Sequence, residues 1–134
     1  ALEIQQGMDT LNAQLAADGA PAMALRIGVH SGPVLAGSMG SSERLEYAVI
    51  GDTVNCASRL ESIDKTRHDN LCRVLVSSAT RELVQDEASA EEQAWLARLQ
   101  WQEWGSLQVK GRQEPLEIWE LRGIAPEAAG ATLA

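Results

Sequence analysis

The sequence predicts an α+β domain, in which helices and strands follow one another along a single short chain. Residues 2–17 repeat apolar side chains at spacings of three and four residues, which is typical of a helix with one apolar face. Residues 24–30 alternate large apolar residues with polar or small ones, which indicates a strand buried on at least one face. Residues 45–61 read LEYAVIGDTVNCASRLE, a short strand that passes through a Gly-Asp turn into a second helix.

Further elements are expected on both sides of this strand–turn–helix unit. They are strands at 34–39, 71–77, 101–109 and 116–121, and a helix from 78 to about 85 that Ser77 or Ser78 caps. The acidic, alanine-rich residues 86–92 predict an exposed connection. We expect the apolar face of the first helix to pack in the core, and the tryptophans to pack together. The residues of this apolar face are Ile4, Met8, Leu11 and Leu15. The tryptophans are Trp95, Trp101, Trp104 and Trp119.

Composition restricts the class of partner. A chain of 134 residues is long enough for one domain and too short for two ordinary ones. Its net charge of −8 argues against nucleic acid or an anionic membrane surface, because either would attract a basic face. With no candidate membrane span or signal peptide, we expect a cytoplasmic location, either free or as the cytoplasmic part of a membrane-anchored sensor. Cys56 and Cys72 lack metal-site spacing and are expected to be reduced thiols in the core.

The helix that follows residue 51 carries the candidate site. Asn55 and Arg59 lie at i and i+4, so they share one polar face about one turn apart. A separate stripe is expected to turn inward, formed by Thr53, Cys56, Leu60 and Ile63. The helix N-terminus and the arginine together favour a phosphate group. The alternative for Arg59 is a surface salt bridge with Glu61 or Asp64.

Three motifs in this order resemble the class III adenylate/guanylate cyclase catalytic domain. They are IGVHSGPVLAG at 27–37, GDTVNxASRLE at 51–61 and LQVKG at 107–111, and the resemblance runs from about Arg26 to Leu121. It implies a ferredoxin-like core with further strands added, an antiparallel-rich sheet with helices packed on it. We expect this catalytic domain to occupy residues 1–123, with a flexible C-terminal tail at 124–134.

The resemblance also implies a reaction. Class III cyclases convert a nucleoside triphosphate to a 3′,5′-cyclic monophosphate and pyrophosphate, and the 3′-oxygen attacks the α-phosphorus in line. By position, Asn55 would orient the ribose, Arg59 would stabilise charge on the α-phosphoryl group, and Lys110 would bind the β- and γ-phosphates. Taken alone, Lys110 could equally be a turn residue.

Base recognition departs from the family pattern. The position three before Gly51 usually carries the side chain that reads the purine, and here it is Ala48, which cannot hydrogen-bond. Base selection would then depend on backbone groups around Val49 and on a residue outside this chain, with Asp52 completing the substrate-binding set. ATP is the expected substrate, because LEYAVIGDTVN resembles bacterial adenylate cyclases, and a guanylate cyclase is the alternative.

Metal ligands are a second departure. In the family, two aspartates hold two Mg²⁺ or Mn²⁺ ions, and neither aspartate motif is present here. Asp9 and Asp18 lie within or after a helix and lack that context. His30 is expected to be structural and not a catalytic base, and the polar loop 64–70 to be solvated and not a metal site. We therefore expect the metal-binding aspartates to lie outside this chain.

The chain thus resembles the C-terminal two-thirds of a cyclase domain, with the N-terminal strands absent. Without them, the first helix and strand 24–30 would face water and sheet edges would lie open. The expected partners are ATP and a second copy or a complementing cyclase segment, because the family's active site forms across a head-to-tail dimer. The competing hypothesis is a catalytically silent cyclase-like subunit that binds nucleotide or supports dimerisation.

Overall fold

The structure, a computed structural model, describes residues 1–41, 44–68, 70–108 and 114–126, with residues 39–49 described by their backbone alone. The helices in these ranges are α1 (Leu2–Ala17), α2 (Asp52–Ser62), α3 (Ser78–Glu87) and α4 (Ala90–Leu96). The strands are β1 (Leu25–Val29), β2 (Leu35–Ser41), β3 (Arg44–Ile50), β4 (Cys72–Ser77), β5 (Leu99–Leu107) and β6 (Leu116–Ile124). The predicted α+β class is confirmed.

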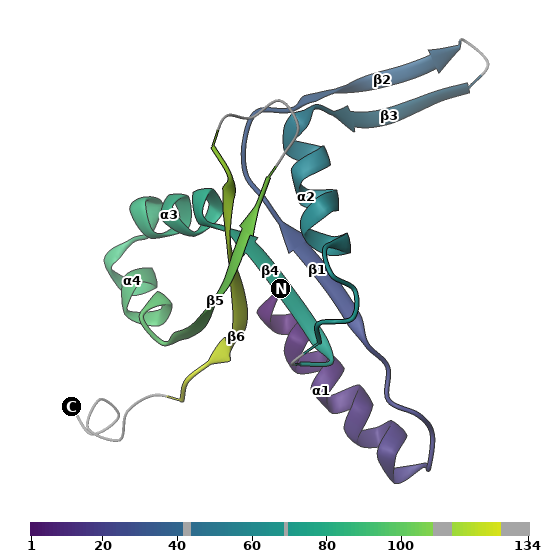
Figure 1. Ribbon diagram of the computed structural model, residues 1–134, viewed down its shortest axis with the longest axis vertical. Helices are drawn as coiled ribbons and strands as arrows, with labels where there is room; N and C mark the ends of the chain where they lie inside the picture. Colours follow the sequence, from purple (N-terminus) through teal and green to yellow (C-terminus); the bar gives the residue numbers. More distant parts are fainter. Residues whose placement is uncertain (42–43, 69, 109–113, 127–134) are drawn as a thin grey trace.

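The main sheet has the strand order β1-β4-β6-β5. The β1 and β4 strands are parallel, whereas β6 is antiparallel to both β4 and β5. The hairpin of β2 and β3 forms a separate two-stranded sheet and extends away from the rest of the molecule (Figure 1). Within the described residues, β1 therefore lies at an edge of the main sheet, with β4 as its one neighbour.

Side chains on the two faces of the main sheet form two separate core clusters. Alternation along the fully buried strand β4 divides them, since Leu75 points to one face while Val74 and Val76 point to the other. The cluster on the α2 side is Cys56, Leu60, Leu75, Trp104, Leu107, Leu116 and Ile118. The cluster on the α1 side is Cys72, Val74, Val76 and Leu121.

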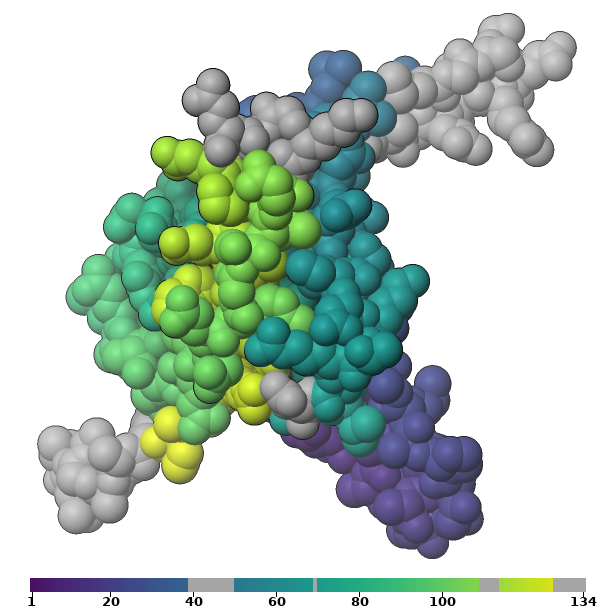
Figure 2. Space-filling model, viewed as in Figure 1, coloured from purple at the N-terminus to yellow at the C-terminus, as the bar shows by residue number. Residues whose placement is uncertain are grey.

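The apolar face of α1 is packed differently from the prediction. Ile4 is 50 % exposed and Leu11 is 36 % exposed, while Leu2 and Met8 pack against the α1-side cluster. The buried residue of the helix is Gln5, whose Nε2 donates to a backbone oxygen of β6 at 2.7 Å. The helix is thus rotated so that Leu2, Gln5 and Met8, which are spaced by three residues, face the sheet. The helix also projects from the body of the molecule (Figure 2).

The prediction that the four tryptophans pack together is wrong for Trp104. Trp104 belongs to the α2-side cluster, whereas Trp101 packs on the opposite face of the sheet. The guanidinium of Arg81 lies 5.0 Å from the ring centre of Trp101 and 4.2 Å from that of Trp119. Trp95 is 45 % exposed on α4. The strand alternation separates residues that are close in the sequence.

The expected connection at 86–92 contains a helix boundary. The α3 helix ends at Glu87 and α4 begins at Ala90, and the Ser89 Oγ accepts from the Glu92 N–H at 3.2 Å while donating to its carboxylate at 3.1 Å. Ser89 is thus the N-cap of α4, and the Ser-x-x-Glu pattern at 89–92 was a signal for this helix start in the sequence. The cap of α3 was predicted correctly, since the Ser77 Oγ accepts from the backbone of Thr80 at 3.3 Å.

The α2 helix lies directly on β1 at Gly28. A Cβ atom added at this glycine would lie 2.5 Å from the Ala57 carbonyl oxygen and 2.6 Å from the Glu61 nitrogen. Both are backbone atoms, which a side-chain rotation cannot move away. The distance between helix and strand is therefore set by the absence of a side chain at position 28.

We expect Gly28→Ala to lower the free energy of unfolding by about 1–3 kcal/mol, because the new methyl group must push α2 off the sheet. The matched control is Gly7→Ala on exposed α1, where nothing lies within 4 Å of the added atom. The control is expected to stabilise by about 0.5–1 kcal/mol. Urea denaturation followed by circular dichroism measures both, and equal effects of the two substitutions would contradict the close contact.

Candidate active site

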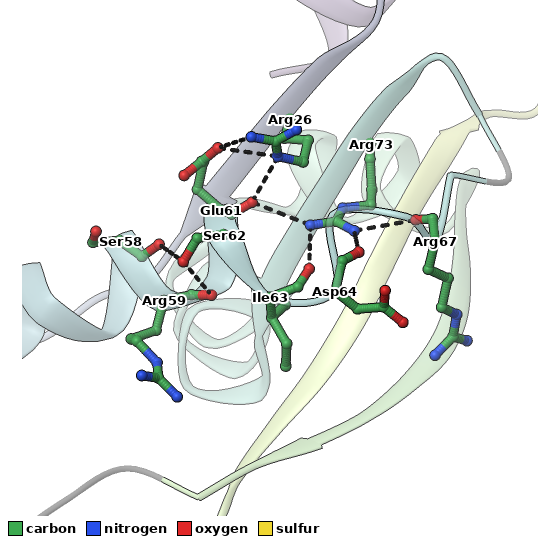
Figure 3. A network of polar contacts seen from close by, with 9 residues as sticks. All are labelled: Arg26, Ser58, Arg59, Glu61, Ser62, Ile63, Asp64, Arg67 and Arg73. Carbon is green, nitrogen blue, oxygen red and sulfur yellow. Dashed lines mark hydrogen bonds and ion pairs between the residues drawn. The ribbon is translucent and has the colours of Figure 1, made fainter.

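Asn55 and Arg59 both lie exposed on α2, one turn apart as predicted. Figure 3 shows the Arg59 side chain pointing away from the polar network at the end of the helix. In the part of the chain that the structure describes, its guanidinium has no ion-pair partner. Glu61 pairs with Arg26 instead, at 3.0 Å between Nη2 and Oε1, and the Asp64 carboxylate accepts from the Thr66 hydroxyl at 2.7 Å. The alternative of a salt bridge from Arg59 is thus not found.

The opposite face of α2 packs inward as predicted. Cys56 and Leu60 are 0 % exposed, and Ile63 packs against their cluster. Thr53, the remaining member of the predicted stripe, instead donates its hydroxyl to the Pro33 carbonyl at 2.7 Å. The first turn of the helix is therefore tied to the segment that follows β1.

The N-terminus of α2 follows a glycine with unusual backbone geometry. Gly51, the N-cap residue, has φ = 139° and no side-chain hydrogen bond caps the helix. Asp52 is the first helical residue and is exposed. The N–H groups of a first turn without a side-chain cap remain available to an anion.

The structure describes two of the predicted substrate-binding residues, Ala48 and Val49, by their backbone alone. Ala48 and Val49 lie on β3, paired with Gly37 and Ala36 of β2, and their side chains lie outside the description. Because β3 leads through one residue into α2, their backbone adjoins the start of the helix.

Lys110 lies outside the described residues. Leu107 and Leu116, the ends of the strands on either side of it, belong to the same core cluster as Cys56 of α2.

The sequence reasoning missed a polar network at the C-terminal end of α2 (Figure 3). Its central residue is Arg73, which is fully buried on β4 and donates to backbone oxygens at the end of the helix. Burial lowers the pKa of the Arg73 guanidinium, and the positive charge of Arg26 lowers it further. The signal in the sequence was one charged residue inside the buried strand CRVLVS.

The described residues do not fit a metal site. Among them, no three His, Cys, Asp or Glu side chains come together as a metal ion requires. In the loop that follows α2, the His68 Nδ1 is 3.0 Å from the Asn70 carbonyl oxygen, and Asp69 is not described. His30 links the ends of two strands, with its Nδ1 2.7 Å from the Ser77 hydroxyl, which suits the predicted structural role.

The two cysteines lie in the core as predicted. Cys56 and Cys72 are both free and buried, and burial raises the pKa of the Cys72 thiol. None of the helices in the described ranges combines the length and the apolar character needed to cross a membrane.

Comparison with known proteins identifies the family. The model for the adenylate and guanylate cyclase catalytic domain matches residues 1–123. The chain belongs to this family. The chain is 34 % identical to adenylate cyclase 1 of Rhizobium meliloti (strain 1021) over 124 residues. This alignment covers 92 % of the chain and 16 % of that relative.

Solved structures confirm the class III cyclase fold. The adenylyl cyclase CyaB from P. aeruginosa superposes with a TM-score of 0.65 at 26 % identity, over 95 % of this cyclase chain and 56 % of that one. The guanylyl cyclase Cya2 gives a TM-score of 0.64 at 26 % identity, over 96 % and 57 % of the respective chains. The cyclase chain thus spans less than two thirds of each of these proteins.

Replacing Thr53 with valine is expected to destabilise the chain by about 0.5–1.5 kcal/mol, because the hydrogen bond to Pro33 is lost while the shape is kept. Thr10→Val is the matched control, since the Thr10 hydroxyl bonds only the preceding turn of exposed α1, at 3.2 Å to Gln6. We expect the control to stay within about 0.5 kcal/mol of the original chain. Urea titrations compare them, and a control effect as large as that of Thr53→Val would refute the assignment.

Proposed function

We propose that this chain supplies the transition-state-stabilising half of an adenylate cyclase active site, which forms 3′,5′-cyclic AMP and pyrophosphate from ATP in cyclic nucleotide signalling. The observation that carries the proposal is the pair of Asn55 and Arg59, which are exposed on a helix whose other face is fixed to the sheet. Membership of the cyclase family supports the reaction class.

The proposed chemistry is an in-line displacement. The ribose 3′-oxygen bonds to the α-phosphorus while the bond to the β-phosphate oxygen breaks, and negative charge builds on the phosphoryl oxygens and the leaving pyrophosphate. The planar guanidinium of Arg59 offers paired donors to the α-phosphoryl oxygens, which suits charge that develops in the transition state. Asn55 orients the ribose through its ring oxygen, and Lys110 binds the β- and γ-phosphates as a flexible point charge.

Class III cyclases use divalent metal ions, and in this proposal Mg²⁺ or Mn²⁺ is held by aspartates outside this chain. The described residues offer no such ligand set. A second copy of the protein or a complementing cyclase segment would then provide the metal-binding half of the site. The exposed Asp52 belongs to the proposed substrate-binding set and not to the metal ligands.

ATP is the proposed nucleotide because the full-length relative from Rhizobium meliloti is an adenylate cyclase. Ala48 leaves the base without a side-chain hydrogen bond at the position that reads it in the family. The two solved structures divide between an adenylyl and a guanylyl cyclase, so GTP is included in the test.

The competing function is a catalytically silent subunit that binds nucleotide or supports dimerisation. The alanine at position 48 and the lack of a metal-ligand cluster in the described ranges favour it. Saturable binding of a labelled ATP analogue with Mn²⁺, without turnover by the longest polypeptide that the gene encodes, would support this alternative.

We expect Arg59→Ala to slow the formation of cyclic AMP, with a loss of about 2–4 kcal/mol of transition-state stabilisation. The reason is that the charge on the α-phosphoryl group loses its guanidinium donors. The side chain is exposed, so stability should change by less than about 0.5 kcal/mol. The assay measures cyclic nucleotides formed from ATP and from GTP with Mn²⁺, using the longest polypeptide that the gene encodes.

Lys65→Ala is the matched control for Arg59→Ala. It removes one positive charge from an exposed position in the turn after the same helix, and we expect full activity. Loss of activity in both variants would indicate a general charge effect, and an active Arg59→Ala variant would refute the assigned role.

A further inference from the structure

Arg73 holds the end of α2 through backbone oxygens (Figure 3). Its Nη1 donates to the carbonyl oxygens of Asp64 at 2.5 Å and Arg67 at 3.1 Å. Its Nη2 donates to those of Ile63 at 2.6 Å and Glu61 at 3.1 Å. Four carbonyl groups from residues 61–67, at the end of α2 and in the loop after it, thus converge on a single guanidinium that is 0 % exposed.

This arrangement is strong for two physical reasons. The last carbonyl groups of a helix lack partners within the helix, and a cation at that end also interacts favourably with the helix dipole. The planar guanidinium presents several donors in a fixed fork, which matches a set of converging acceptors better than an ammonium group. The ring of Trp104 lies 5.0 Å from the Arg73 guanidinium and 3.7 Å from that of Arg67.

A neighbouring arginine supports the same turn. Arg26 on β1 pairs in register with Arg73 on β4, and its Nε donates to the Glu61 carbonyl oxygen at 3.2 Å. That carbonyl therefore receives donors from two adjacent strands.

The turn is connected directly to the proposed catalytic arginine. The Ile63 N–H donates to the Arg59 carbonyl oxygen at 2.9 Å, while the Ile63 carbonyl accepts from Arg73 at 2.6 Å. One residue thus links the buried guanidinium to the backbone that carries the Arg59 side chain. The side chain of Arg59 itself takes no part in the network drawn in Figure 3.

We propose that Arg73, assisted by Arg26, is a positioning residue that sets the location of Arg59 relative to the nucleotide. The inference rests on the proposed function, because it takes Arg59 as the group that meets the α-phosphoryl oxygens. Arg73 is fully buried on β4 and donates to backbone oxygens, so it can act only through another residue. It acts by fixing the last turn of α2 on the sheet, so that the guanidinium of Arg59 is in place before charge develops.

The test replaces Arg73 with lysine, whose single ammonium group cannot reach all four carbonyl groups. A displacement of Arg59 by about 1 Å would cost up to about 100-fold in kcat. The KM for ATP should stay nearly constant, because Arg59 acts on charge that develops only in the transition state. The assay again uses the longest polypeptide that the gene encodes.

A double substitution separates positioning from general damage. In the Arg59→Ala background, Arg73→Lys should cause no further loss of kcat, since the group that it positions is gone. Arg81→Lys is the matched control, because Arg81 also stacks on tryptophan rings but lies on the other face of the sheet. Its kcat should be unchanged. A loss from Arg73→Lys of equal size in both backgrounds, or no loss at all, would overturn the proposal.

Hydrogen exchange provides a readout that does not need activity. In Arg73→Lys, the amides of residues 59–63 should exchange faster while those of β6 keep their protection. Uniform acceleration over both would show a structural role alone and overturn the proposal. If the original protein makes no cyclic nucleotide, the proposed function fails, whereas the exchange pattern still decides whether Arg73 anchors the helix.

A second variant keeps the test decisive if Arg73→Lys does not fold. Arg26→Met alters a partly exposed side chain and removes one of the two donors to the Glu61 carbonyl. We expect a smaller loss of kcat, again absent in the Arg59→Ala background. An unchanged kcat together with unchanged exchange at residues 59–63 would overturn the proposal.

Discussion

The contact of α2 with β1 at Gly28 is the constraint on which the arrangement of the site depends. With no side chain at this position, the backbone of the helix lies against the strand. This short distance lets the threonine of the first turn reach the Pro33 carbonyl. It also brings the last turn within reach of two arginines on adjacent strands. The helix is thus fixed at its start, its middle and its end.

Packing and the proposed chemistry use separate faces of α2. Cys56 and Leu60 bury the inward face, while Asn55 and Arg59 on the outward face take no part in the core. A side chain without a packing role can be matched to a ligand at little cost to stability. The precision that its position requires comes from the backbone beneath it, which the sheet holds.

The sequence predicted the features that depend on local pattern. Hydrophobic spacing and the Gly-Asp turn placed β3 and α2, and three ordered motifs identified the family that the comparisons confirm. It did not predict that Trp101 and Trp104 lie on opposite faces, or which row of α1 meets the sheet, because both depend on how distant elements pack. Arg73 was missed for the same reason, since its acceptors belong to a turn that no local pattern connects to β4. The roles of the predicted catalytic and substrate-binding residues remain predictions, and these residues are Asn55, Arg59, Lys110, Ala48, Val49 and Asp52.

The two arginines that hold the end of α2 differ in how they respond to the solution. Arg73 is surrounded by amide dipoles, which do not titrate and are not shielded by mobile ions at a fully buried position. Arg26 instead pairs with the carboxylate of Glu61, and the two side chains are 29 % and 42 % exposed, so added salt weakens that contact. The helix end therefore combines a buried contact that is insensitive to ionic strength with an exposed one that weakens as salt is added. The buried contact preserves the geometry when the salt concentration changes.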